Sequence, residues 1–88
     1  MLINKLIWDG TEHVEWILND GSTLKRIWKY HPKSVILLSD RTGIMVIEAV
    51  EESGPTNLLV INSDGSERMR PSLPTNYGHT YGFIYGGI

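Results

Sequence analysis

The chain has 88 residues, a length that fits one domain with a thin hydrophobic core. Hydrophobic residues make up 41% of it and charged residues 20%, so the composition indicates a folded chain and not a disordered one. The formal net charge of −2 argues against non-specific binding to nucleic acid, which needs a basic surface. The absence of cysteine excludes a disulfide framework and a thiolate nucleophile or metal site.

The first eight residues are apolar, but they carry no basic start and no small-residue cleavage site, so they do not predict a signal peptide. No apolar run approaches the length of a membrane span. We therefore expect a cytoplasmic protein without a membrane segment.

The first part of the chain predicts three strands separated by Asp-Gly turns. The predicted strands are residues 2–8, 13–18 and 23–30. The third is ambiguous, because Leu24, Arg26, Trp28 and Tyr30 share one face of a strand, whereas Leu24, Ile27, Trp28 and His31 form a helical stripe. The Asp20-Gly21 turn before it favours a hairpin, so a strand is expected.

Three continuous apolar runs follow, at residues 35–38, 44–47 and 58–61, with loops at 39–43 and 51–56. Runs without alternation are typical of strands that are buried on both faces. One small open sheet cannot provide this burial. We therefore expect that the sheet folds onto itself or that copies of the chain associate, most simply as a dimer.

The clearest local signal is the hairpin at residues 57–70. Its apolar run ends at Ser63-Asp64-Gly65, where serine and aspartate suit a type I turn and Gly65 supplies the left-handed position. Pro71 and Pro74 then bracket a connection that cannot lie in a central strand.

These patterns together predict an all-β fold, an antiparallel meander of about eight short strands and no helix. A sandwich, a small barrel and two propeller-like units all satisfy the pattern. The whole chain, residues 1–88, is expected to form one domain.

An internal duplication is a further possibility, with residues 1–44 repeated as 45–88. At this offset Asp20-Gly21-Ser22 falls on Asp64-Gly65-Ser66, and Arg26 falls on Arg70. The alternative is that Asp-Gly turns recur in any β meander. The period and the strand, Ser-Asp-Gly, strand pattern resemble a β-propeller blade, although the His and Trp-Asp signatures of well-known blades are missing. The resemblance implies a binding platform, and two blades alone would have to associate.

No pattern in the sequence indicates catalysis, a metal or a cofactor. The three histidines, at 13, 31 and 79, are scattered, and Asn62-x-Asp64-Gly65 lacks the remaining ligands of a calcium loop. No nucleophile elbow of the G-x-S-x-G type occurs, so a small hydrolase is kept as a minor alternative.

A cluster of basic and aromatic residues gives the first functional hypothesis, a small non-enzymatic interaction protein of the inhibitor or immunity type. Its predicted partner site comprises Lys25, Arg26, Trp28, Lys29 and Tyr30. With the negative net charge, an acidic protein is the expected partner, and nucleic acid is not expected. The alternative interpretation is a solvated edge strand protected by lysines.

The C-terminal part gives a second hypothesis, a lectin-like module. Five residues would share one face of a strand there: Tyr77, His79, Tyr81, Phe83 and Tyr85. Such a row either forms a core layer or stacks on a ligand.

Overall fold

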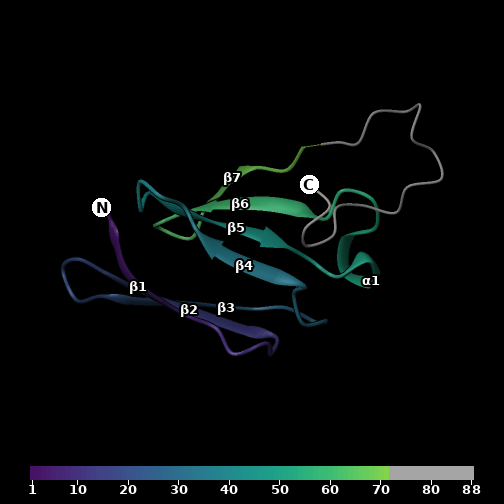
Figure 1. Cartoon of the computed structure of the whole chain (residues 1–88), viewed down its shortest axis with the longest axis horizontal. Helices are drawn as coiled ribbons and strands as arrows, with labels where there is room; N and C mark the ends of the chain where they lie inside the picture. Colours follow the sequence, from purple (N-terminus) through teal and green to yellow (C-terminus); the bar gives the residue numbers. More distant parts are fainter. Residues whose placement is uncertain (72–88) are drawn as a thin grey trace.

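The structure is a computed structural model that describes residues 1–71. Two antiparallel sheets pack against each other (Figure 1). The first has three strands in the order β1-β2-β3. Its strands are β1 (Ile3–Ile7), β2 (His13–Leu18) and β3 (Thr23–Ile27).

The second sheet has four strands in the order β4-β5-β6-β7. Its strands are β4 (Ser34–Leu37), β5 (Gly43–Ile47), β6 (Leu58–Asn62) and β7 (Glu67–Met69). A short helix, α1 (Val50–Ser53), connects β5 to β6. The predicted loop at residues 51–56 is therefore wrong for residues 51–53, which are helical. The all-β fold class is confirmed, because each sheet is an antiparallel meander.

The ambiguous segment 23–30 is a strand over Thr23–Ile27, and the helical alternative is wrong. The preceding turn decides the outcome. Gly21 has φ 90°, and the amide of Leu18 donates to the carbonyl of Ser22 at 2.8 Å. This closes a hairpin and pairs β3 with β2 along its whole length.

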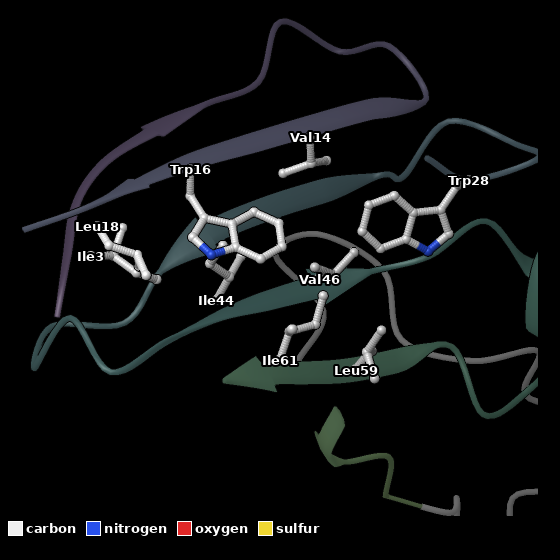
Figure 2. Packing of buried hydrophobic residues seen from close by; sticks show 9 residues of the cluster. All are labelled: Ile3, Val14, Trp16, Leu18, Trp28, Ile44, Val46, Leu59 and Ile61. Carbon is white, nitrogen blue, oxygen red and sulfur yellow. The ribbon is translucent and has the colours of Figure 1, made fainter. Parts of the chain in front are cut away.

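The core lies between the two sheets (Figure 2). Alternate residues of β2 point into it, and Trp16, with 1% of its surface exposed, is the largest fully buried side chain among residues 1–71. The buried cluster consists of Ile3, Val14, Trp16, Leu18, Trp28, Ile44, Val46, Leu59 and Ile61. The indole N–H of Trp16 donates to the carbonyl of Ser63 at 2.8 Å, so this ring links β2 to the turn after β6.

Burial on both faces holds for β5 and β6. In β5, Ile44 and Val46 face the core, and Ile47 on the other face is also buried. In β6, Leu59 and Ile61 face the core, and Val60 on the other face is buried. The expectation is wrong for β4, because this strand forms an edge of its sheet and Ile36 is exposed. The predicted dimer stays a prediction.

Three hairpin turns share one hydrogen-bond pattern. The side chain of Asp20 accepts bonds from the amide and hydroxyl of Ser22, and Asp64 does the same with Ser66. Asp40 accepts the equivalent bonds from Thr42 in the turn between β4 and β5. The predicted left-handed position of Gly65 is confirmed by its φ of 90°.

Replacing Gly65 with valine is expected to lower the free energy of unfolding by about 1–2 kcal/mol, because a β-branched residue resists a positive φ. A Cβ at this position would also lie 3.4 Å from Leu24 Cδ2, a contact that leaves little room for a larger side chain. Gly21 is the matched control, since it has the same φ of 90° and open space around its Cβ position. Urea denaturation should therefore show a loss for Gly65→Val that is at least as large as that for Gly21→Val. An unchanged midpoint for Gly65→Val would contradict the turn assignment.

The offset of 44 residues places equivalent turns on each other, but it does not preserve the faces of the strands. Leu18 and its counterpart Asn62 both precede the turn, yet Leu18 belongs to the core cluster and Asn62 does not. Likewise Ile17 is outside the cluster, and its counterpart Ile61 is fully buried. The duplication stays a prediction.

Candidate protein-binding edge

The β3 strand forms one edge of the three-stranded sheet. Hydrogen-bonded pairs alternate along an antiparallel ladder. Trp28 N donates to Glu12 O, and Leu18 N donates to Ser22 O, so the even-numbered residues of this segment bond to β2. The backbone groups of Thr23, Lys25 and Ile27 therefore point away from β2, and in residues 1–71 no strand pairs with them on that side.

The side chains of β3 divide between the two faces of the sheet. Lys25 and Ile27 lie on the outer face, and Ile27 is 60% exposed. Arg26 is half-buried on the other face, with its guanidinium 4.9 Å from the centre of the Trp28 ring. Lys25 and Arg26 therefore lie on opposite faces of the sheet and do not form one continuous basic surface, although the predicted partner site contains both.

After β3 the chain is held by two bonds that fix the next residues. Trp28 donates its indole N–H to Glu48, and the amide of Tyr30 donates to Glu52 Oε1 at 2.9 Å. The ammonium of Lys29 lies 5.6 Å from the centre of the Tyr30 ring, and both side chains are exposed. Lys29 and Tyr30 therefore lie directly after β3, in a segment that these two hydrogen bonds hold in place.

Trp28 cannot serve as a surface contact, because only 4% of it is exposed. Its ring packs in the core cluster, as Figure 2 shows. Of the five residues in the predicted partner site, Lys25, Lys29 and Tyr30 are exposed and Arg26 is half-buried. Trp28 is therefore a core residue and not part of the predicted partner surface.

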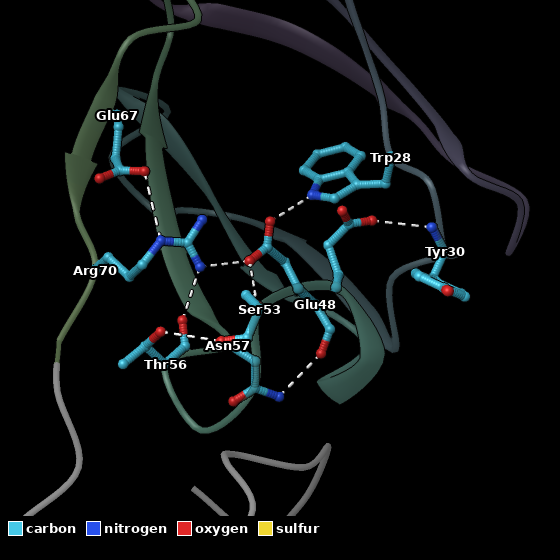
Figure 3. A network of polar contacts seen from close by, with 9 residues as sticks. Trp28, Tyr30, Glu48, Ser53, Thr56, Asn57, Glu67 and Arg70 are labelled. Carbon is cyan, nitrogen blue, oxygen red and sulfur yellow. Dashed lines mark hydrogen bonds and ion pairs between the residues drawn. The ribbon is translucent and has the colours of Figure 1, made fainter.

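A buried polar cluster lies beside this segment and joins both sheets (Figure 3). Its centre is the Glu48 carboxylate, which is 2% exposed. Oε1 of Glu48 accepts bonds from Arg70 Nη1 and from Ser53 Oγ, and Oε2 accepts the bond from Trp28 Nε1. Arg70 also donates to the Thr56 carbonyl at 2.7 Å, and the side chain of Asn57 donates to the Glu48 carbonyl at 2.9 Å.

Burial alone raises the pKa of the Glu48 carboxyl, but hydrogen bonds from Arg70, Trp28 and Ser53 outweigh it and leave the pKa below its ordinary value. The group is therefore an anion at neutral pH and has no proton to donate as a general acid. Its three donors come from three separate parts of the chain. The cluster thus anchors the segment after β3 to the second sheet and positions Lys29 and Tyr30.

Sequence reasoning missed this cluster, although one signal was present. Glu48 is the only charged residue between Gly43 and Val50, in a run that was expected to be buried. A buried carboxylate needs a cation and further donors. The partner, Arg70, is distant in sequence, so the pairing itself could not be predicted from spacing.

The described residues contain no group of three His, Asp or Glu side chains that could hold a metal ion. Within residues 1–71 no helix is long and apolar enough to cross a membrane. The alternative ligand-binding row, Tyr77, His79, Tyr81, Phe83 and Tyr85, lies outside the described residues.

Comparison with known proteins found no relative of this chain. No protein-family model, no curated protein and no solved structure matches the chain.

Proposed function

We propose that the chain is a small interaction protein that binds an acidic protein partner along the β3 edge. The observation that supports this proposal is the open edge itself. It combines backbone groups that point away from the sheet with an exposed Ile27 and with the cations Lys25 and Lys29 on either side of it.

An exposed edge can accept an extended segment of another protein as an additional strand. The backbone groups of Thr23, Lys25 and Ile27 supply the hydrogen bonds. The Ile27 side chain supplies an apolar contact, and the two lysines select acidic residues in the partner. The same lysines discourage uncontrolled pairing of edges between copies, because like charges repel.

The anchored segment after β3 extends this surface. Tyr30 offers an aromatic side chain with a polar tip, a type that is common at interfaces, and it is 40% exposed. Its backbone is fixed by Glu52, so little conformational entropy is lost when a partner packs on it.

A selection experiment tests the proposal with displayed peptides in place of the partner. Random peptides displayed on phage are selected against the wild-type chain and then measured against Lys25→Pro. Proline removes one outward N–H, and it is tolerated at an edge position whose N–H faces solvent. We expect the selected peptides to be acidic and to bind Lys25→Pro at least about tenfold more weakly, which corresponds to about 1.4 kcal/mol.

The charge contribution is tested with Lys25→Glu and Lys29→Glu together, because both side chains are exposed. The double variant should weaken binding and flatten its dependence on salt without changing the circular dichroism spectrum. Arg26 is left unchanged, because its stacking on Trp28 contributes to packing. Lys5→Glu, at an exposed position on β1, is the matched control. If the selected peptides bind all these variants equally well, the β3 edge is not the binding surface.

A further inference from the structure

An open cleft of about 300 Å³ lies on the outer face of the three-stranded sheet, at the loop between β1 and β2. It is lined by Ile7, Trp8, Asp9, Thr11, His13 and Glu15. Its volume is at the lower end of the range for small-molecule sites, so it suits a small group or a single side chain.

The loop that forms the cleft is held by its own hydrogen bonds. The indole N–H of Trp8 donates to the Thr11 carbonyl at 2.8 Å, and the amide of His13 donates to Thr11 Oγ1 at 3.3 Å. The Glu12 carbonyl accepts the bond from Trp28 N, which connects the loop to β3. Since the Trp8 N–H is already used, Trp8 contributes its indole ring, and not its N–H, to the lining of the cleft.

Two carboxylates in the lining have no partner in the described part of the chain. Neither Asp9 nor Glu15 forms an ion pair or a side-chain hydrogen bond there. Lys25 is the register partner of Glu15, yet the two charges do not form an ion pair. Glu12 adds a third carboxylate beside the cleft, 3.8 Å from the His13 imidazole. The lining of the cleft therefore combines an indole ring with two carboxylates that form no ion pair.

We propose that this cleft binds an organic cation, and specifically a lysine or arginine side chain of a partner protein. An indole face attracts an ammonium or guanidinium group, and carboxylates add charge-assisted hydrogen bonds. The exposed Ile7 beside them accommodates the aliphatic stem of such a side chain. The proposal does not rest on the β3 edge, because the lining residues come from β1, β2 and the loop between them.

The composition of the cleft separates this ligand from two others. A metal ion requires ligands at about 2–2.6 Å from one point, and no His, Asp and Glu group in residues 1–71 meets that requirement. A sugar presents hydroxyls that need donors as well as acceptors. The free groups of this cleft are mainly carboxylate acceptors, which match the excess of donors on an ammonium or guanidinium.

NMR titration of the full chain tests the assignment. The probes are Nα-acetyl-arginine amide and Nα-acetyl-lysine amide, with methyl glucoside and calcium chloride as competing ligand classes. We expect a saturable shift of the assigned Trp8 indole resonance with the cationic amides. Glu15→Gln and Asp9→Asn should each weaken binding by at least about fivefold, and about 0.5 M salt should weaken it further.

Glu51→Gln is the matched control, because it removes one exposed charge from the helix between β5 and β6. It should leave the affinity unchanged. Lys25→Pro removes the cation opposite Glu15, so it should not weaken the binding of the cationic amides, which separates this test from that of the β3 edge. The proposal is overturned if no saturable shift occurs, if methyl glucoside or calcium binds at least as tightly, or if Glu51→Gln weakens binding as much as Glu15→Gln does.

Discussion

Replacing Arg70 with methionine is expected to lower the free energy of unfolding by about 3–5 kcal/mol. The substitution keeps an apolar stem but removes the cation beside the buried Glu48 carboxylate. It also removes the donor to the Thr56 carbonyl. A buried anion without its cation costs far more than a surface charge, for which changes usually stay within about 0.5 kcal/mol. Urea denaturation at pH 7 measures the difference, with Lys5→Met as the surface control.

A double-mutant cycle with Glu48→Gln separates the pair from its surroundings. Glutamine is neutral, so the Arg70→Met/Glu48→Gln variant no longer buries an uncompensated anion. We therefore expect the double variant to lose less stability than the sum of the two single variants. Strict additivity would show that Glu48 and Arg70 do not interact in solution.

The pH dependence provides a second measurement of the same pair. The pKa of Glu48 is lowered in the folded state, so its contribution is complete above the unfolded value of about 4.3 and is lost as the pH falls through the folded value. Arg70→Met removes a hydrogen-bond donor that lowers the pKa of Glu48, whereas burial still raises that pKa. The pKa of Glu48 should therefore be higher in the variant than in the wild type. The variant should therefore lose less stability than the wild type between about pH 6 and about pH 3.

The aspartates of the three hairpin turns also contribute to the loss of stability at low pH, in the wild type and in the variant. Hydrogen bonds from Ser22, Thr42 and Ser66 lower the pKa of Asp20, Asp40 and Asp64, respectively. These groups destabilise the wild type and the variant equally on acidification. The difference between the two curves therefore reports the carboxyls that Arg70 contacts, which are the buried Glu48 and, at 3.6 Å, the exposed Glu67. If the two curves run parallel, Arg70 does not control the Glu48 pKa.

Local signals predicted the strands because the turns act over a few residues. The Asp-Gly turns at Gly21 and Gly65 need a left-handed position, and this requirement defines where β2, β3, β6 and β7 begin and end. The turn between β4 and β5 was predicted only as a loop, because its left-handed residue is Arg41 and not glycine. Asp40 accepts the same two hydrogen bonds from Thr42 as the aspartates of the other two turns accept from serine. An arginine at the left-handed position, however, does not indicate a turn in the sequence.

Long-range features could not be predicted from these local patterns. The division into a three-stranded and a four-stranded sheet depends on the segment between β3 and β4, where no periodicity marks a change of sheet. The burial of Trp28 depends on Glu48, which lies 20 residues away and accepts its N–H. Alternation placed Lys25 and Arg26 on opposite faces of a strand, but it could not show which face is the core.

The cleft beside Trp8 was not predicted for a similar reason. Its lining comes from a strand end, a loop and the facing strand, and the register of β1 with β2 brings Ile7 opposite Glu15. A bulge between Ile3 and Lys5 shifts that register, and no residue in the sequence marks it. The separate residues were visible, but their proximity depends on this irregular pairing.

Truncating Trp16 is expected to cause a loss of similar size to Arg70→Met. Trp16→Ala should lower the free energy of unfolding by about 3–5 kcal/mol, because it removes a fully buried tryptophan side chain and leaves a cavity between the sheets. Trp16→Phe keeps an aromatic ring but leaves the buried Ser63 carbonyl without its donor, which should cost about 1–3 kcal/mol.

Trp8 is the matched control for this series, since it is only partly buried and packs at the margin of the core. Trp8→Ala should cost clearly less than Trp16→Ala in the same urea titration. The Trp16 bond to Ser63 joins β2 to the turn between β6 and β7, so it also fixes where Gly65 approaches β2. Trp16→Phe should therefore increase hydrogen exchange at the turn amide of Gly65 more than at that of Gly21. Equal losses for Trp16→Ala and Trp8→Ala would mean that the sheets are not held together through Trp16.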